Sequence, residues 1–226
     1  MKTRIVVGVA GVVLGVLVIA SGPWVLRSIP FFSVRQVELR GVRYHSPERL
    51  LQALNIAPDQ NLFDSLREIE ERTLLLPGVV SARAKRRLPG TLTIEVGESV
   101  PVAFVPTSTG LLAIDEDATP LTYDPTLTGL DLPIVQTADT ALARVLAAVR
   151  SADSVLFECV DAARFATGNA VMLQLGATSV ILRNEPTADE ILAVALVRRS
   201  LASSGKTYDE LDARFDGRVL VRGSGA

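Results

Sequence analysis

The sequence predicts an α+β protein with one N-terminal transmembrane helix, a compact β-α-α-β-β unit and an antiparallel-rich α+β domain. The first 26 residues contain a long uncharged apolar segment. In residues 34–96 the apolar pattern changes from period two to helical spacing and then back to period two. From residue 100 onward, short apolar runs punctuated by Pro and Gly alternate with two helical patterns.

The apolar segment predicts a membrane anchor. No charged residue lies within residues 5–26, and a helix of this length spans about 33 Å, against a hydrocarbon core of about 30 Å. Residues 1–4 form a short basic flank, and Trp24 lies at the far end, where an indole prefers the headgroup layer. We expect residues 1–4 in the cytoplasm and the remainder outside it. The alternative is a cleaved signal peptide, because residues 18–20 fit a small-x-small cleavage site before Ser21.

Three glycines share one face of the expected helix. Gly8, Gly11 and Gly15 follow each other at spacings of three and four residues. Small residues let transmembrane helices approach closely, so this face is a candidate for packing against a partner helix. Background glycine in an apolar span is the alternative interpretation.

The β-α-α-β-β unit begins with a strand and a helix. Residues 34–40 alternate in polarity and end at Gly41, which predicts a strand. Ser46 is a good N-cap and Pro47 suits the first helical turn, so residues 47–54 are expected to be helical.

A second helix is expected next, because the residues after position 61 form one apolar stripe at helical spacing. Asp64 or Ser65 can cap the start of this helix, and Pro77 and Gly78 end it. The stripe consists of Leu62, Leu66, Ile69 and Thr73.

A β-hairpin closes the unit, with its turn at residues 88–90. Leu92, Ile94 and Val96 alternate with polar residues and are expected to face the two helices, while Thr93 points to the other side. The expected helical partners of this strand are Leu50, Leu54, Leu66 and Ile69. Three basic side chains of the hairpin, Arg83, Lys85 and Arg87, are interpreted as a solvated face.

The second half predicts short strands and two helices. An extended link covers residues 131–135, and a tight turn joins the last two strands at Asp216 and Gly217. The expected strands are 104–105, 111–114, 121–123, 155–157, 171–175, 180–183, 211–215 and 218–222, and the expected helices are 142–149 and 188–203.

The composition and motifs give no support for catalysis, a metal, a cofactor or nucleic acid. The net charge is −2, which does not suit a polyanionic partner. His45 is the only histidine and is interpreted as a surface turn residue, while Cys159 is alone and is interpreted as a small apolar group. Residues 115–117 are acidic, but a Ca²⁺ loop needs more ligands, so a hairpin turn is the preferred interpretation.

Several stretches resemble the FtsQ/DivIB family of bacterial cell-division proteins. "FFSVRQVELRGVRYHSPERLLQAL" is similar to the start of a POTRA domain, and "LLLPGVVSARAKRRLPGTLTIEVGESVPVAF" is similar to its end in that family. "LLAIDEDATPL", "DLPIV" and "ELDARFDGRVLVR" resemble the later landmarks. The resemblance implies a POTRA domain at 31–99, an FtsQ-type β domain at 100–222 and a tail at 223–226.

The resemblance also implies a function. Members of this family are non-enzymatic scaffolds of the divisome, anchored in the inner membrane at the septum, with their globular domains in the periplasm. The POTRA domain would recruit other division proteins, and the distal domain would dock the small coiled-coil proteins FtsB and FtsL. Two alternatives stay open: a POTRA-containing factor of outer-membrane assembly or secretion, and an extracytoplasmic enzyme with unrecognised active groups.

The final strand is the candidate docking site. A terminal strand is often the edge of its sheet, where unpaired N–H and C=O groups can accept an incoming strand. The resemblance implies the same role, since the matching strand there pairs with a strand of FtsB. Phe215 is expected to be an apolar anchor, Arg214 to pair with a partner carboxylate, and Arg164 to assist nearby. The remaining candidate residues are Gly217, Arg218, Val219, Leu220, Val221 and Arg222; the alternative is an edge protected only by the two arginines.

Overall fold

The computed structural model describes residues 30–223 except 58–59, 124–128 and 216. The predicted anchor at 5–26, with Gly8, Gly11 and Gly15, and residues 224–226 of the tail therefore lie outside the described residues. None of the helices in the described part is long and apolar enough to cross a membrane. The chain divides into two compact units, residues 1–98 and 99–226.

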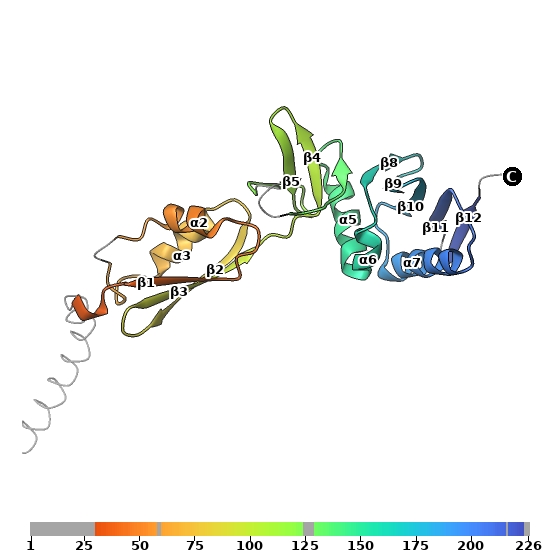
Figure 1. The fold of residues 1–226 in the computed structure, drawn as a ribbon. Helices are drawn as coiled ribbons and strands as arrows, with labels where there is room; N and C mark the ends of the chain where they lie inside the picture. Colours follow the sequence, from red (N-terminus) through yellow and green to blue (C-terminus); the bar gives the residue numbers. More distant parts are fainter. Residues whose placement is uncertain (1–29, 58–59, 124–128, 216, 224–226) are drawn as a thin grey trace, which may run out of the picture. The chain divides into compact units, whose positions relative to one another are not determined.

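The first unit has the predicted β-α-α-β-β order around a three-stranded sheet (Figure 1). The strand order is β1-β3-β2, with β1 parallel and β2 antiparallel to the central β3. A short 3-10 turn, η1 (Pro30–Phe32), precedes β1 (Gln36–Arg40), α2 (Pro47–Leu54), α3 (Arg67–Leu74), β2 (Val79–Arg87) and β3 (Thr91–Glu98).

The two helices begin differently. Helix α2 has the predicted bounds, and the Ser46 side chain accepts the N–H of Arg49 at its N-terminus. The predicted caps of α3 are wrong: the helix starts after Leu66, which makes no side-chain cap hydrogen bond. Asp64 instead accepts the N–H of Asn61 at 2.8 Å, which holds the preceding turn.

The predicted inward face of β3 is confirmed, with one correction on its other face. Thr93, expected to be outward and tolerant, is only 6% exposed. It lies on the central strand between Glu38 of β1 and Lys85 of β2, and long side chains flank it on both sides. The buried core consists of Leu54, Leu62, Ile69, Ala84, Leu92, Ile94 and Val96, with Leu66 only partly buried against it.

Strand β2 carries an irregularity at its start. The pairing register with β3 shifts between Val79 and Ser81. As a result Val79 packs against the core, whereas Val80 is 66% exposed.

The end of β3 holds the loop that leads into α2. The carboxylate of Glu98 accepts the backbone N–H groups of Arg43, Tyr44 and His45 at 2.6, 2.8 and 3.1 Å, and it contacts His45 Nδ1 at 2.7 Å. Burial acts to raise the pKa of Glu98, but these donors together lower it below its ordinary value. His45 lies in a turn as predicted, but its side chain is only 11% exposed, because Glu98 and the carbonyl of Pro77 enclose its ring.

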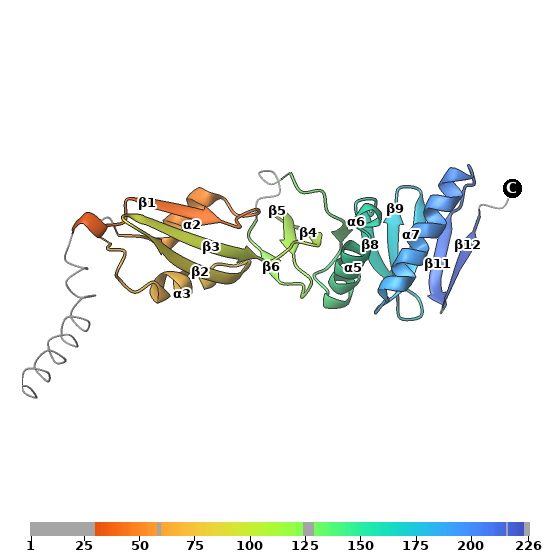
Figure 2. The same ribbon diagram turned by 90° about the horizontal axis from the view of Figure 1, so that it is seen from below.

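The second unit is a nine-stranded mixed sheet in the order β12-β11-β10-β9-β8-β7-β4-β5-β6. Helices α5 (Thr140–Ala152), α6 (Ser154–Phe157) and α7 (Ala188–Ser203) lie alongside it (Figure 2). The strands are β4 (Ala103–Thr107), β5 (Gly110–Ile114), β6 (Pro120–Leu121), β7 (Ile134–Val135), β8 (Ala162–Ala166), β9 (Ala170–Leu175), β10 (Thr178–Arg183), β11 (Glu210–Phe215) and β12 (Arg218–Arg222).

Two expectations about this unit need correction. The strand predicted at 155–157 is the short helix α6, because the Asp153 side chain accepts the N–H of Leu156 at 2.8 Å and caps a helical turn. Strand β8 was not predicted, and it pairs with β7 in parallel. The pairs β4–β7 and β10–β11 are also parallel, while the other five pairs of the sheet are antiparallel, in keeping with the predicted antiparallel-rich domain.

The acidic run at 115–117 forms the predicted turn. Asp115 accepts the N–H groups of Asp117 and Thr119 and the hydroxyl of Ser99. Among the described residues no group of three or more His, Cys, Asp or Glu side chains is suited to hold a metal ion.

The core of the first unit can be tested on its hairpin. Ile94→Asp places a carboxylate at a fully buried position and is expected to unfold this unit, because a lone buried charge costs more than a typical domain can supply. Val80→Asp, at the exposed end of the neighbouring strand, is expected to change stability by about 0.5 kcal/mol or less. Thermal melting followed by circular dichroism measures both. Equal tolerance of the two changes would contradict the observed register.

Candidate docking edge

Strand β12 lies at one end of the nine-stranded sheet, next to β11 (Figures 1 and 2). On its other side no strand of the described residues pairs with it. The predicted edge position is therefore confirmed, and the backbone of β12 determines which groups that edge presents.

The contact between β10 and β11 sets the direction of the backbone groups in β11. The N–H of Ser179 donates to the carbonyl of Asp209 at 2.9 Å, and Ser179 is in register with Glu210. In a parallel pair this pattern directs the N–H and C=O of Leu211 toward β10. Because neighbouring residues alternate, Glu210 and Asp212 direct their backbone groups toward β12.

The same alternation continues into β12. The partners of those two residues are Arg222 and Leu220, so both turn their N–H groups inward to β11. Val219 and Val221 consequently direct their N–H and C=O groups outward, away from the sheet. The edge therefore offers two donor–acceptor sites, which are separated by Leu220.

A β-bulge sharpens the turn before the edge. The register shifts between the pairs Asp212–Leu220 and Phe215–Arg218, which leaves two residues of β11 opposite Val219 alone. Gly217 has a φ of +66°, a left-handed conformation that glycine adopts without strain. Phe215 therefore lies opposite Arg218, at the start of the edge strand, which is called the rim below.

The edge is apolar in its middle and basic at its ends. Phe215, Leu220 and Val221 are 48%, 43% and 46% exposed, so three large apolar side chains lie together at this end of the sheet. Arg218 and Arg222 are exposed at the two ends of β12. This composition suits an incoming strand that is apolar in its middle.

A buried carboxylate supports the edge from beneath. Asp212 is fully buried and accepts hydrogen bonds from Arg214 Nε at 2.9 Å and Nη2 at 2.7 Å. Arg222 bridges from β12 to Glu210 at 2.6 Å and to Asp212 at 3.4 Å. The bonds from Arg214 lower the pKa of Asp212 against the effect of its burial, and the same contact raises the pKa of Arg214.

Arg214, expected to pair with a partner carboxylate, already has contacts within its own chain. Its guanidinium forms a bidentate contact with Asp212 of its own chain, donates to the carbonyl of Thr167 at 3.3 Å and lies 6.0 Å from the ring centre of Phe215. It therefore positions the rim, and a pairing with a partner carboxylate would compete with a contact already made. Asp212 was not predicted, although its i, i+2 spacing to Arg214 places both on one face of a strand.

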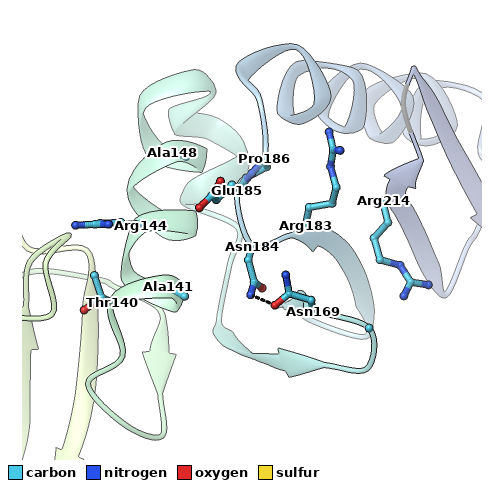
Figure 3. A pocket seen from close by; sticks show the side chains of 11 residues that line it. Thr140, Ala141, Arg144, Ala148, Asn169, Arg183, Asn184, Glu185, Pro186 and Arg214 are labelled. Atoms are coloured by element: carbon cyan, nitrogen blue, oxygen red, sulfur yellow. Dashed lines mark hydrogen bonds between the residues drawn. The ribbon is translucent and has the colours of Figure 1, made fainter.

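Arg164 lies further from the edge than expected. It belongs to β8, separated from β12 by three strands, and its Nη2 approaches Met172 Sδ at 3.1 Å. An open groove of about 1010 Å³ lies near this region, between the start of α5 and the ends of β9, β10 and β11. Figure 3 shows Arg144, Arg183 and Arg214 around it, with Asn184 donating to Asn169 at 2.7 Å between them.

Comparison with known proteins finds a family model that matches part of the chain and relatives that share one name. Residues 32–99 match the model of the POTRA domain, FtsQ-type. The chain is 30% identical over 114 residues to "Cell division protein FtsQ" of Corynebacterium glutamicum, a match covering 50% of this chain and 49% of that protein. It is 32% identical over 117 residues to the protein of the same name from Mycobacterium tuberculosis, covering 51% of this chain and 37% of that protein.

A third match, over 76 residues at 32% identity, is to the same-named protein of Syntrophotalea carbinolica, with 33% of this chain and 27% of that protein covered. The matched stretches thus span half or less of the length of these relatives.

The Asp212 cluster predicts acid sensitivity of the second unit. Because the pKa of Asp212 is lower in the folded than in the unfolded chain, its stabilisation is complete above the unfolded value of about 3.9 and is lost as the pH falls through the folded value. Asp212→Asn should cost about 1–3 kcal/mol at pH 7 and flatten the pH dependence below pH 4. Urea unfolding at pH 7 and pH 3 measures both effects. An Asp212→Asn variant as stable as the parent at pH 7 would contradict the role of the cluster.

Proposed function

We propose that this chain, which carries an FtsQ-type POTRA domain and is homologous to proteins named Cell division protein FtsQ, is a non-enzymatic scaffold of the bacterial divisome. It docks small coiled-coil division proteins of the FtsB and FtsL type by adding their strand to β12. The POTRA domain serves as a separate recruitment module for other division proteins.

The open edge of β12 is the observation that carries this proposal. Two outward N–H groups and two outward carbonyls can form a ladder with an added strand, while Phe215, Leu220 and Val221 supply apolar contact. Main-chain pairing gives affinity and the side chains give register. Arg218, which is exposed at one end of the strand, favours a partner strand with an acidic residue opposite it, and such a charge pattern steers association. Arg222, at the other end, is already paired with Glu210 and Asp212 of its own chain.

The same proposal places the chain in the membrane. Residues 5–26 act as a retained anchor in the inner membrane, with residues 1–4 in the cytoplasm and the globular units in the periplasm at the septum. A scaffold of this kind needs no catalytic group, since it acts by holding partners at one place. The sequence supports the anchor through its uninterrupted apolar run.

Edge docking is tested by substituting proline at Val219, whose N–H points outward, and by comparing it with proline at Leu220, whose N–H points inward. Val219→Pro removes an outward donor and adds a ring where the partner strand approaches, while inward pairing with β11 is retained. We expect binding of FtsB-like partners to weaken roughly tenfold, equivalent to about 1.4 kcal/mol, with an unchanged circular dichroism spectrum. Co-purification and titration with the purified partner segment provide the measurement.

Leu220→Pro is the contrasting variant, because its N–H points inward and its loss should destabilise β12 itself. Val219→Ala is the conservative control and should bind nearly as well as the parent. Full binding by a folded Val219→Pro variant and by Phe215→Ala would mean that the partner docks elsewhere.

Retention of the anchor is tested by N-terminal sequencing of protein extracted from membranes. A chain that keeps residues 5–26 is expected, because the apolar run continues beyond the length of a signal-peptide core. A mature chain that begins at Ser21 would contradict the anchor and leave an exported protein without it.

A further inference from the structure

Helix α7 has apolar residues on both of its sides. Ile191, Val194 and Ala195 are buried beneath the helix, as expected for its sheet-facing side. Leu192 and Leu196, one turn apart on the outer side, are 43% and 64% exposed. The outer side of a surface helix normally carries polar residues, so two adjacent exposed leucines indicate a surface that is covered in use.

The outer side of α7 is accessible in the second unit. Figure 2 shows α7 lying across the strands, and none of the labelled helices and strands of this unit covers it. Capping hydrogen bonds stabilise both ends of the helix. A capping box formed by Thr187 and Glu190 begins it, and at its other end Lys206 N–H donates to Leu201 and Gly205 N–H to Ala202, as in a Schellman motif.

Charges flank the two leucines symmetrically. Asp189 precedes Leu192 by three residues, and Arg199 follows Leu196 by three residues, which places all four on one stripe of the helix. Asp189 is exposed, and it belongs to no ion pair among the described residues. Arg199 is 59% exposed at its side chain and reaches Asp153 at 3.3 Å, with capacity for a second acceptor.

This stripe is complementary to itself when it is reversed. Two antiparallel copies centred between Leu192 and Leu196 bring each Leu192 against the other copy's Leu196. They also bring each Asp189 against the other copy's Arg199, since both lie five residues from the centre. A parallel arrangement would instead oppose aspartate to aspartate and arginine to arginine, which is unfavourable. A lipid surface is a less suitable occupant of this stripe, because it would leave the charge of Asp189 without a counter-charge.

We infer that α7 is the contact of a symmetric dimer in which two copies of this chain pack antiparallel through Asp189, Leu192, Leu196 and Arg199. Such an isologous contact uses the same patch on both copies and closes on itself. One helix face is a small interface, so the dimer is expected to be weak in free solution and favoured where copies are concentrated. The four residues of this surface belong to α7, and none of them lies on β12.

The test is the self-association of the detergent-solubilised full chain, followed by analytical ultracentrifugation over a range of concentrations. We expect a concentration-dependent dimer, at least tenfold weaker in Leu196→Glu. Asp189→Arg and Arg199→Asp should each weaken the dimer, and the double variant should recover it, because the swap restores both contacts. Val219→Pro is the matched control on the docking edge and should dimerise like the parent.

The outcomes separate this inference from the proposed function. A chain that stays monomeric at every concentration overturns the inference, as does a dimer unaffected by Leu196→Glu or one lost in Val219→Pro, which would indicate edge-to-edge pairing. Failure of the double charge swap to recover the dimer overturns the antiparallel arrangement. Binding of the coiled-coil partner segment by Leu196→Glu should equal that of the parent, so a loss of edge docking is measured separately.

Discussion

The alternation of backbone hydrogen bonds through β10, β11 and β12 is the constraint on which the properties of the second unit depend. Once Ser179 donates to Asp209, Leu211 must face β10 and its neighbours must face β12. The two valines of β12 are then left with outward backbone groups. The same period of two places Asp212 on the face where arginines from β11 and β12 can both reach it.

The two faces of this sheet end are stabilised by different interactions. On one face α7 packs against β11 and β12, and apolar residues such as Val194 of α7 and Leu211 of β11 are fully buried. On the other, burial of the Asp212 carboxylate is offset by Arg214 and Arg222, which hold the last two strands together through charge rather than through apolar area. An edge strand supported in this way can keep exposed apolar side chains without pairing them within its own chain.

The first unit shows the same use of a carboxylate at a different place. Glu98 ends the central strand and accepts three consecutive backbone donors from the loop after β1. These donors belong to a segment without regular structure, so without Glu98 they would need water or another acceptor. In both units, therefore, a poorly exposed carboxylate is compensated by several donors of its own unit.

The sequence by itself determined most elements and the order in which they occur. The bounds of α2 and α7 follow from Ser46, Pro47 and the helical spacing of leucines, and the last hairpin follows from alternation around Gly217, because these signals act between residues close in the chain. Tertiary structure decided what depends on neighbours distant in sequence. Thr93 is buried because β3 is the central strand. The helix at residues 154–157 is a local feature that the apolar pattern did not indicate, since the Asp153 side chain accepts the N–H of Leu156 and caps it. The Arg214 side chain pairs with Asp212 because that carboxylate is buried and needs a donor. The burial of Asp212 results from the surrounding tertiary structure and cannot be predicted from the neighbouring residues in the sequence.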